Sequence, residues 1–156
     1  MPGTERWIVL CGSMSMHARM LEEKQYLEEA GVTVILPPAE DPVMPGLGEE
    51  EYQAVKRKAA LAHFRKVMDP KTFAVLAVNA DKHGVRDYLD PNTFAEVAVA
   101  FALGKRIYLL QNVPRNLEDE LRAWGAVPLR GQLDRLIDDY FHACCQTEGT
   151  PAPAPG

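Results

Sequence analysis

The sequence predicts an α/β fold in which a parallel sheet is covered by helices on both faces. Short apolar runs typical of buried strands alternate along the chain with longer segments of helical periodicity. This alternation favours a parallel sheet, because parallel strands joined by helices are covered on both faces. The length of 156 residues suits one domain with a substantial core, and the hydrophobic fraction of 47% is ordinary for a globular protein. We therefore expect a flavodoxin- or Rossmann-like three-layer sandwich with a sheet of four to five strands.

The first half of the chain provides two strands and two helices. The strands are apolar or β-branched runs that end at Gly12-Ser13 and at Pro37-Pro38. Gly31 stops the first helix, and the second begins with three glutamates, which suit the positive end of a helix dipole. In order, we expect a strand at Trp7–Cys11, a helix at Met14–Ala30, a strand at Val32–Leu36, a loop at Ala39–Gly48 and a helix at Glu49–Asp69. The last helix has an expected buried stripe of Tyr52, Val55, Ala59, Ala62 and Phe64.

The second half continues the same alternation. In order, we expect a strand at Phe73–Val78, a polar loop at Asn79–Pro91, a helix at Phe94–Leu103, a strand at Arg106–Leu110 and helices at Leu117–Trp124 and Leu133–Cys144. The helix at Phe94–Leu103 is expected to be buried, because Glu96 is its only polar residue. Residues 1–146 should form a single domain. The Pro-Ala tail at 147–156 should be disordered, because it can form neither a helix nor a core.

Composition excludes several kinds of partner. A net charge of -5 argues against binding to a nucleic-acid polymer, and no apolar run approaches the roughly 20 residues of a membrane helix. The first residues lack the apolar core of a signal peptide, so a cytoplasmic location is expected. The three cysteines, Cys11, Cys144 and Cys145, have no metal or redox spacing and are expected to be free thiols. We expect no metal and no cofactor.

Polar segments follow three of the expected strands. They are the Gly12-Ser13-Met14-Ser15 turn, the loop from Asn79 to Pro91, and Gln111-Asn112. In open parallel sheets, ligands bind outside the carboxyl ends of the strands, where the strand order reverses. These three segments should therefore gather at one edge and form a site.

Glu96 is the first candidate for chemistry at this edge. One interpretation is a capping box, in which Thr93 caps the helix and Glu96, three residues on, bonds back to the Thr93 backbone N–H. The other is a nucleophile, because a carboxylate can attack an anomeric carbon and form a covalent glycosyl intermediate. Both interpretations remain open on spacing alone.

The loop from Asn79 to Pro91 is the second candidate, because acids, a lysine, a histidine, an arginine and a tyrosine cluster in it. Asp90 has a structural alternative as the cap of a helix that opens at Pro91, and Asp81 has one as an Asx-turn residue before Gly84. Cleavage of a glycosidic C–N bond needs a proton on the leaving base and hydrogen bonds to the sugar. Asp81 and Asp90 are therefore candidate catalytic residues, and Asn79 and Tyr88 are candidate substrate-binding residues.

The glycine-serine turn after the first strand is the third candidate. Gly12, Ser13 and Ser15 lie where a helix begins, so their N–H groups and hydroxyls can bind an anion. The turn has neither the G-x-G-x-x-G pattern nor the Walker lysine, so it supports neither a dinucleotide site nor a P-loop. His17, His63 and His142 are scattered without metal spacing and are expected on helix surfaces.

Two segments, Ile8–Ser13 and Thr93–Glu96 with the Ala-Leu-Gly-Lys105 helix end, resemble the nucleoside 2-deoxyribosyltransferase-like superfamily, which includes nucleoside 5′-monophosphate N-glycosidases. The resemblance covers roughly residues 6 to 112 and implies a homodimer or higher oligomer. It implies that Glu96 is the nucleophile, that Gly12 and Ser13 bind substrate, and that Asp90 contacts the sugar or base. It also places Asn112 near a residue that reaches a neighbouring subunit's site. Ser15 stands where the N-glycosidases have arginine, so Arg19, Lys82 or Arg86 would have to supply that charge.

These observations favour an enzyme that cleaves the N-glycosidic bond of a nucleoside or nucleoside 5′-monophosphate by double displacement through Glu96. The sugar would pass either to water, as in a hydrolase, or to a second base, as in a transferase. The alternative is a binding module of the same fold that holds a nucleotide-like ligand without turnover, with Glu96 as a capping residue.

Overall fold

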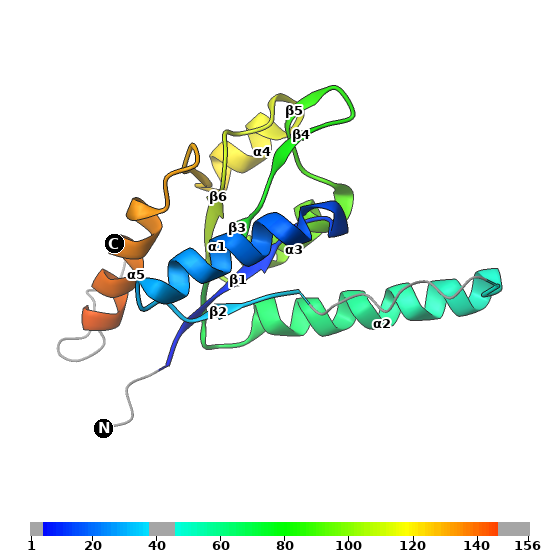
Figure 1. The fold of residues 1–156 in the computed structure, drawn as a ribbon, viewed down its shortest axis with the longest axis horizontal. Helices are drawn as coiled ribbons and strands as arrows, with labels where there is room; N and C mark the ends of the chain where they lie inside the picture. The colour runs from blue at the N-terminus through cyan, green and yellow to red at the C-terminus, as the bar shows by residue number, and fades with distance from the viewer. Residues whose placement is uncertain (1–4, 38–45, 147–156) are drawn as a thin grey trace.

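The protein is described here by a computed structural model, which covers residues 5–37 and 46–146. The central sheet has five parallel strands in the order β2-β1-β3-β6-β7 (Figure 1). Their bounds are Trp7–Cys11 for β1, Val34–Ile35 for β2, Thr72–Ala77 for β3, Arg106–Leu109 for β6 and Val127–Pro128 for β7. The predicted α/β fold with a parallel sheet of four to five strands is confirmed. The predicted tail at 147–156 and most of the loop at Ala39–Gly48 lie outside the described residues.

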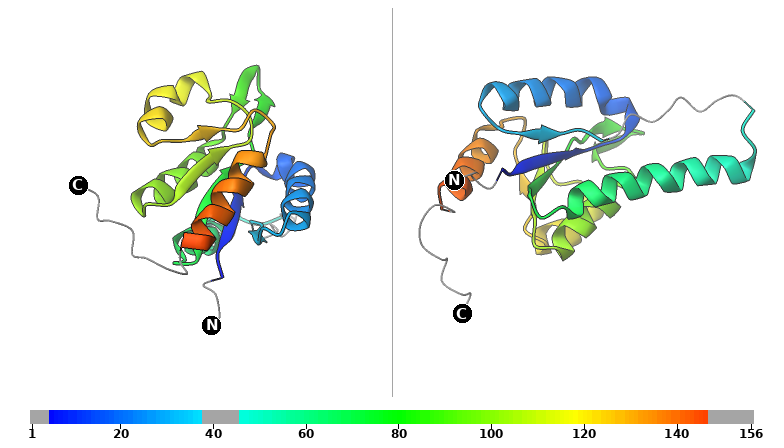
Figure 2. Two further views of the ribbon diagram at one scale, coloured as in Figure 1. Left: turned by 90° about the vertical axis from the view of Figure 1, so that its left-hand side faces the viewer. Right: turned by 90° about the horizontal axis from the view of Figure 1, so that it is seen from below.

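Helices cover both faces of this sheet. Their bounds are His17–Glu29 for α1, Glu49–Met68 for α2, Pro91–Ala102 for α3, Glu118–Ala123 for α4 and Asp134–Gln146 for α5, with 3-10 turns at Met14–Met16 and Arg115–Leu117. Figure 2 (right) shows α1 and α2 on opposite sides of β1. Among the described helices, none has both the length and the hydropathy needed to cross a bilayer.

The core consists of two layers, because neighbouring side chains of a strand point to opposite faces. In β1, Ile8 and Leu10 face the layer that holds Met20 and Leu27 of α1 and Leu136 of α5. Val9 and Cys11 face the other layer, formed with side chains of α2, α3 and α4, namely Val67, Val97, Ala100 and Leu121. Cys11 therefore points to the same side of the sheet as α2 and α3.

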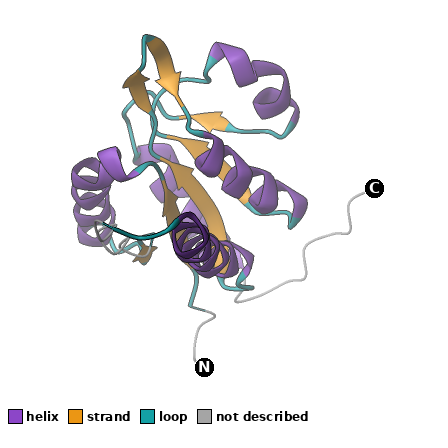
Figure 3. Ribbon diagram, turned by 90° about the vertical axis from the view of Figure 1, so that its right-hand side faces the viewer, coloured by secondary structure: helices purple, strands orange, loops and turns teal. Residues whose placement is uncertain are grey.

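The polar loop expected at Asn79–Pro91 is instead largely a β-hairpin. Its strands are β4, Ala80–Lys82, and β5, Val85–Tyr88, and they pair antiparallel as a separate two-stranded sheet. His83 and Gly84 at its tip have φ angles of 54° and 72°, which is the pattern of a two-residue type I′ turn. The sequence analysis predicted a loop here because the segment is polar. Figure 3 shows the hairpin rising past the end of the central sheet.

Helix α2 is long, as predicted, but its predicted buried stripe is wrong. Its buried residues are His63 and Val67, whereas Val55 is 41% exposed. A 20-residue helix such as α2 is about 30 Å long, whereas a six-residue strand such as β3 is about 20 Å long. Helix α2 therefore extends beyond the end of the sheet. Figure 1 shows its N-terminal half projecting beyond the strands.

Helix α3 is only partly buried, in contrast to the prediction. Glu96, Val97 and Ala100 face the sheet, while Phe101 is 44% exposed. On its outer side Trp124 stacks against both Phe94 and Phe101, with centroid distances of 5.3 and 5.2 Å.

Candidate functional site

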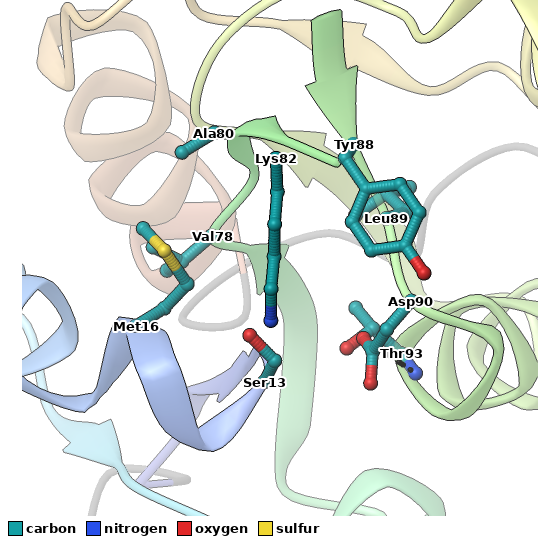
Figure 4. Close-up of a pocket in the computed structure, with 9 residues that line it drawn as sticks. All are labelled: Ser13, Met16, Val78, Ala80, Lys82, Tyr88, Leu89, Asp90 and Thr93. Carbon is teal, nitrogen blue, oxygen red and sulfur yellow. Dashed lines mark hydrogen bonds between the residues drawn. The ribbon is translucent and has the colours of Figure 1, made fainter. Parts of the chain in front are cut away.

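A small pocket lies where the order of the strands reverses. The chain leaves β1 for β2 on one side and returns to β3 on the other, so the switch point lies between the carboxyl ends of β1 and β3. Gly12 and Ser13 follow β1 at this point, and Val78 follows β3, with its N–H bonded to the Cys11 carbonyl. The pocket is lined by Ser13, Met16, Val78, Ala80, Lys82, Tyr88, Leu89, Asp90 and Thr93 (Figure 4). We call it the switch-point pocket.

One wall of this pocket carries hydroxyl and ammonium donors. Lys82 Nζ on the hairpin donates to Ser15 Oγ at 2.9 Å, and Ser15 Oγ shares a hydrogen bond of 2.8 Å with Ser13 Oγ. Figure 4 shows the Lys82 side chain extending from the hairpin toward Ser13. Ser13 is the N-cap of the 3-10 turn that leads into α1, and its carbonyl accepts a hydrogen bond of 2.9 Å from the Met16 N–H. This group of donors can bind an anion such as a phosphate.

Close packing explains why a glycine occupies position 12 in this turn. A Cβ built at Gly12 would lie 3.3 Å from Met20 Sδ and 3.4 Å from the Val78 carbonyl oxygen. The absence of a side chain lets the turn after β1 approach the end of β3 closely. This contact places Ser13 at the pocket.

Asp90 and Tyr88 form the opposite wall. Asp90 is the N-cap of α3, and its Oδ1 accepts a hydrogen bond of 3.3 Å from the Thr93 N–H, with Pro91 at the first helical position. The capping alternative for Asp90 is therefore confirmed. The capping box of Thr93 and Glu96 is wrong, because the helix starts two residues before Thr93 and Asp90 occupies the N-cap. Glu96 must then have another reason to lie in an apolar layer.

Glu96 belongs to a buried cluster with Cys11 and His63. His63 is 3% exposed and Glu96 5%, and His63 Nδ1 lies 2.7 Å from Glu96 Oε1. This contact is a close approach rather than a hydrogen bond, because Nδ1 has no hydrogen-bond partner of regular geometry. His63 Nε2 lies 3.2 Å from the Leu10 carbonyl oxygen. The imidazole therefore connects β1 to Glu96 on α3.

Cys11 is the third member of this cluster. Burial raises the pKa of the Cys11 thiol well above its usual value, and the charge and hydrogen-bonding of Glu96 raise it further. Cys11 therefore stays a neutral thiol that donates to Glu96. One ligand atom from each of the three residues lies within 4.8 Å of the others, so the described residues bring a thiol, an imidazole and a carboxylate together where no metal site was predicted.

Sequence reasoning missed His63 and the role of Cys11. The expectation that His63 lies on a helix surface is wrong. A signal was present in the row Ala59, His63 and Val67, because residues spaced by four share one face of a helix. The contact itself depends on the packing of α2 against α3, which the spacing of residues along either helix does not determine.

Other predicted residues lie outside the switch-point pocket. Asp81 and Asn112 line a neighbouring hollow together with Ala80, Arg86, Asp87 and Gln111. Arg19 forms an ion pair of 2.7 Å with Glu23 on α1. Of the three cations considered for a phosphate, Lys82 is the one that reaches the glycine-serine turn.

Asn79 is 1% exposed and is bonded entirely to backbone. Its amide nitrogen donates to the carbonyls of Asp87 and Asn112 at 3.0 and 2.9 Å, and its oxygen accepts from the Gln111 N–H at 2.9 Å. This side chain joins the hairpin to the segment after β6. Its predicted contact with substrate stays a prediction.

Comparison with known proteins gives one distant structural likeness to report. No protein-family model matches the chain, and no curated protein matches it. A solved structure of a 2-deoxyribosyltransferase from Bacillus psychrosaccharolyticus is similar at 20% sequence identity and a TM-score of 0.44, over 65% of this chain and 69% of that one.

Proposed function

We propose that the protein cleaves the N-glycosidic bond of a nucleoside or nucleoside 5′-monophosphate, with Glu96 as the nucleophile. The observation that carries this proposal is the switch-point pocket, in which anion donors on one wall face Asp90 on the other. Glu96 follows Thr93 by one helical turn, directly beyond the pocket lining. A phosphate on the Lys82 wall and a sugar beside Asp90 would bring the anomeric carbon to this end of α3.

The reaction would be a double displacement. A Glu96 oxygen bonds to the anomeric carbon as the C–N bond breaks, and the electron pair leaves with the base. The base takes a proton from a donor in the pocket, for which Tyr88 is the candidate, while Asp90 accepts from the sugar hydroxyls. Water or a second base then displaces Glu96. The Glu96 side chain, 7% exposed, must approach the sugar from its contact with His63.

The test is release of free base from a panel of nucleosides and their 5′-monophosphates. Glu96→Gln keeps the size of the side chain and removes the nucleophile, so turnover should fall by at least about a thousandfold. Glu118→Gln, a half-buried acid on α4, is the matched control. Near-normal turnover by Glu96→Gln would disprove the mechanism, and a second free base added to the assay separates a transferase from a hydrolase.

A second candidate is a nucleotide-binding module without turnover. The burial of Glu96 against His63 and Cys11 favours it, because a carboxylate with two protein partners can be purely structural. In that case the wild type and Glu96→Gln would bind a nucleoside monophosphate in calorimetry equally well, and neither would release base.

A further inference from the structure

We propose that Cys11, His63 and Glu96 form a buried binding site for Zn²⁺, and that an ion held there inhibits the proposed reaction by occupying the Glu96 carboxylate. The three side chains come from β1, α2 and α3, and one ligand atom of each lies within 4.8 Å of the other two. Binding of the ion depends on this cluster alone. Inhibition rests on the proposed function, because it concerns Glu96 as the nucleophile.

The orientation of His63 leaves a nitrogen lone pair available to a cation. A carbonyl oxygen only accepts hydrogen bonds, so the contact of 3.2 Å between Nε2 and the Leu10 carbonyl oxygen requires the hydrogen on Nε2. A neutral imidazole of this form has its lone pair on Nδ1, which is buried, has no hydrogen-bond partner and lies beside Glu96. A histidine that binds a metal through one nitrogen usually donates from the other to a backbone carbonyl or a carboxylate. His63 has this arrangement.

The three donor types indicate which ion the cluster would prefer. Thiolate, imidazole and carboxylate are the ligands that Zn²⁺ uses in proteins, whereas Ca²⁺ and Mg²⁺ take oxygen ligands. Around a tetrahedral Zn²⁺, with bond lengths of about 2.0 Å, the ligand atoms of His63 and Glu96 would lie about 3.3 Å apart. They lie 2.7 Å apart, so a shift of about half an ångström by the Glu96 side chain would admit the ion.

Charge compensation favours a divalent cation in this layer. The His63 and Glu96 side chains are 4% and 7% exposed, and Cys11 is fully buried. Buried charges are stable when they are paired or coordinate a metal. On binding, Zn²⁺ bonds to the Cys11 sulfur and the thiol proton leaves to the solvent. The thiolate and the Glu96 carboxylate then balance the two positive charges of the ion, and the neutral imidazole adds none.

The environment of Cys11 opposes this loss of the proton in the metal-free protein. Burial raises the pKa of the thiol, and Glu96 raises it further. A coordinated divalent ion overcomes this barrier, because it deprotonates a thiol outright. We therefore expect the sulfur to be a thiol without the ion and a thiolate with it.

An ion in this site would change the chemistry of Glu96. A carboxylate that shares its electron pair with a divalent cation is a poor nucleophile. The proposed reaction also requires the Glu96 side chain to leave its contact with His63 and approach the sugar, whereas a bound ion holds it against His63 and Cys11. Base release should therefore stop while the site is occupied and resume when a chelator removes the ion.

Metal binding is tested without an activity assay. The full chain, freed of metal with a chelator, is loaded with Zn²⁺ or with Co²⁺, whose thiolate complexes absorb in the near ultraviolet. We expect one tightly bound ion per chain by elemental analysis, and a thiolate band with Co²⁺. Cys11→Ala and His63→Gln should each weaken binding at least about a hundredfold, and Cys11→Ala should remove the band. The control combines Cys144→Ala and Cys145→Ala, which removes the other two thiols of the chain and should keep both the ion and the band.

X-ray absorption by the zinc-loaded wild type makes the test independent of whether a variant folds. The expected ligands are one sulfur at about 2.3 Å and two or three nitrogen or oxygen atoms at about 2.0 Å. A wild type that binds no stoichiometric ion, an ion without a sulfur ligand, or binding that the control variant abolishes would overturn the proposed site.

Inhibition is tested by measuring base release before loading, after one equivalent of Zn²⁺ and after the chelator. Release by the wild type should fall in proportion to the occupied fraction and recover on chelation. Any release that Cys11→Ala retains should be unaffected by the same zinc concentration. Stoichiometric zinc that leaves base release unchanged would refute the inhibition. Base release by Glu96→Gln, or none by the metal-free wild type, would instead refute the proposed function and leave the zinc site standing.

Discussion

At the scale of single residues, Asp90 has two roles: it caps α3 and it lines the switch-point pocket. We predict that Asp90→Ala lowers the free energy of unfolding by about 1 kcal/mol, the usual cost of a lost N-cap. Asp90→Ser should restore most of this stability, because its hydroxyl can accept from the Thr93 N–H. Urea unfolding measures both, and Asn92→Ala, on the exposed first turn of the same helix, is the control.

Lys82 contributes a charge that only a phosphorylated substrate would use. We predict that Lys82→Met lowers kcat/KM for a nucleoside 5′-monophosphate by about tenfold or more, since hydrogen bonds to charged groups contribute about 1.5–3 kcal/mol. The value for the matching nucleoside should not change.

Arg86→Met is the control for this comparison, because Arg86 lies on the same hairpin but lines the neighbouring hollow. An equal loss on nucleoside and nucleotide would show that Lys82 does not bind the phosphate.

At this scale the sequence located Glu96 at the start of a helix and the serines at a strand end. Both positions follow from local patterns that one segment contains. It could not pair Glu96 with His63, because 33 positions separate them and only the packing of α2 on α3 brings them together. It also could not choose between two local caps, since Asp90-Pro91 and Thr93-Glu96 both have the required residue types.

At the scale of elements, the hairpin β4–β5 is attached to the body of the protein by Asn79. We predict that Asn79→Ala lowers the free energy of unfolding by about 2 kcal/mol, because it leaves buried backbone groups without partners. It should also weaken ligand binding, since Lys82 and Tyr88 lie on that hairpin.

Urea unfolding and calorimetric titration with a nucleoside monophosphate measure these two effects. Asn116→Ala, an exposed asparagine in the turn before α4, is the control. A variant that keeps full stability would mean that the bonds made by Asn79 are replaced by other groups.

The predicted strands β1, β3 and β6 were found within a residue or two at each end, because continuous apolar runs mark strands covered on both faces. The hairpin escaped prediction because its strands are largely polar and none of their residues is fully buried, so they lack the apolar run that marks a buried strand. The burial of α2 was misjudged for another reason. Periodicity shows which side of a helix is apolar, but not how far the sheet extends beneath it.

For the whole molecule, the buried phenol of Tyr108 links stability to pH. Burial raises its pKa, and so do the hydrogen bond and charge of Asp139, whose Oδ2 accepts from the hydroxyl at 2.7 Å. Above about pH 10 the unfolded chain loses this proton while the folded state keeps it, so stability falls as pH rises. We predict that Tyr108→Phe makes this fall less steep.

Urea unfolding from about pH 8 to pH 11 tests this difference, because the range spans the ordinary pKa of tyrosine. Tyr26→Phe, an exposed tyrosine on α1, is the control. Burial lowers the pKa of Lys105, so Lys105 makes stability rise with pH, opposite to the effect of Tyr108. This contribution is the same in the wild type, Tyr108→Phe and Tyr26→Phe, and it cancels when they are compared.

Several large apolar side chains among the described residues are exposed to solvent. Val55 and Leu61 on α2 are 41% and 47% exposed, and Leu103 at the end of α3 is 49% exposed. We predict a dimer or higher oligomer at micromolar concentration, and sedimentation equilibrium measures it against the 17.3 kDa of one chain. Paired Val55→Lys and Leu61→Lys changes should shift the mass toward the monomer, whereas Val85→Lys on the hairpin should not.

The two outermost strands of the sheet limit how such an assembly can form. Both β2 and β7 are only two residues long, and β7 ends in Pro128, which has no N–H to donate. Short edge strands and proline in an edge strand discourage the sheet of one molecule from pairing with the sheet of another. Self-association by pairing of edge strands between two molecules is therefore disfavoured. Copies of this chain should instead contact one another through helix surfaces, where substitutions can separate the copies without disrupting the sheet.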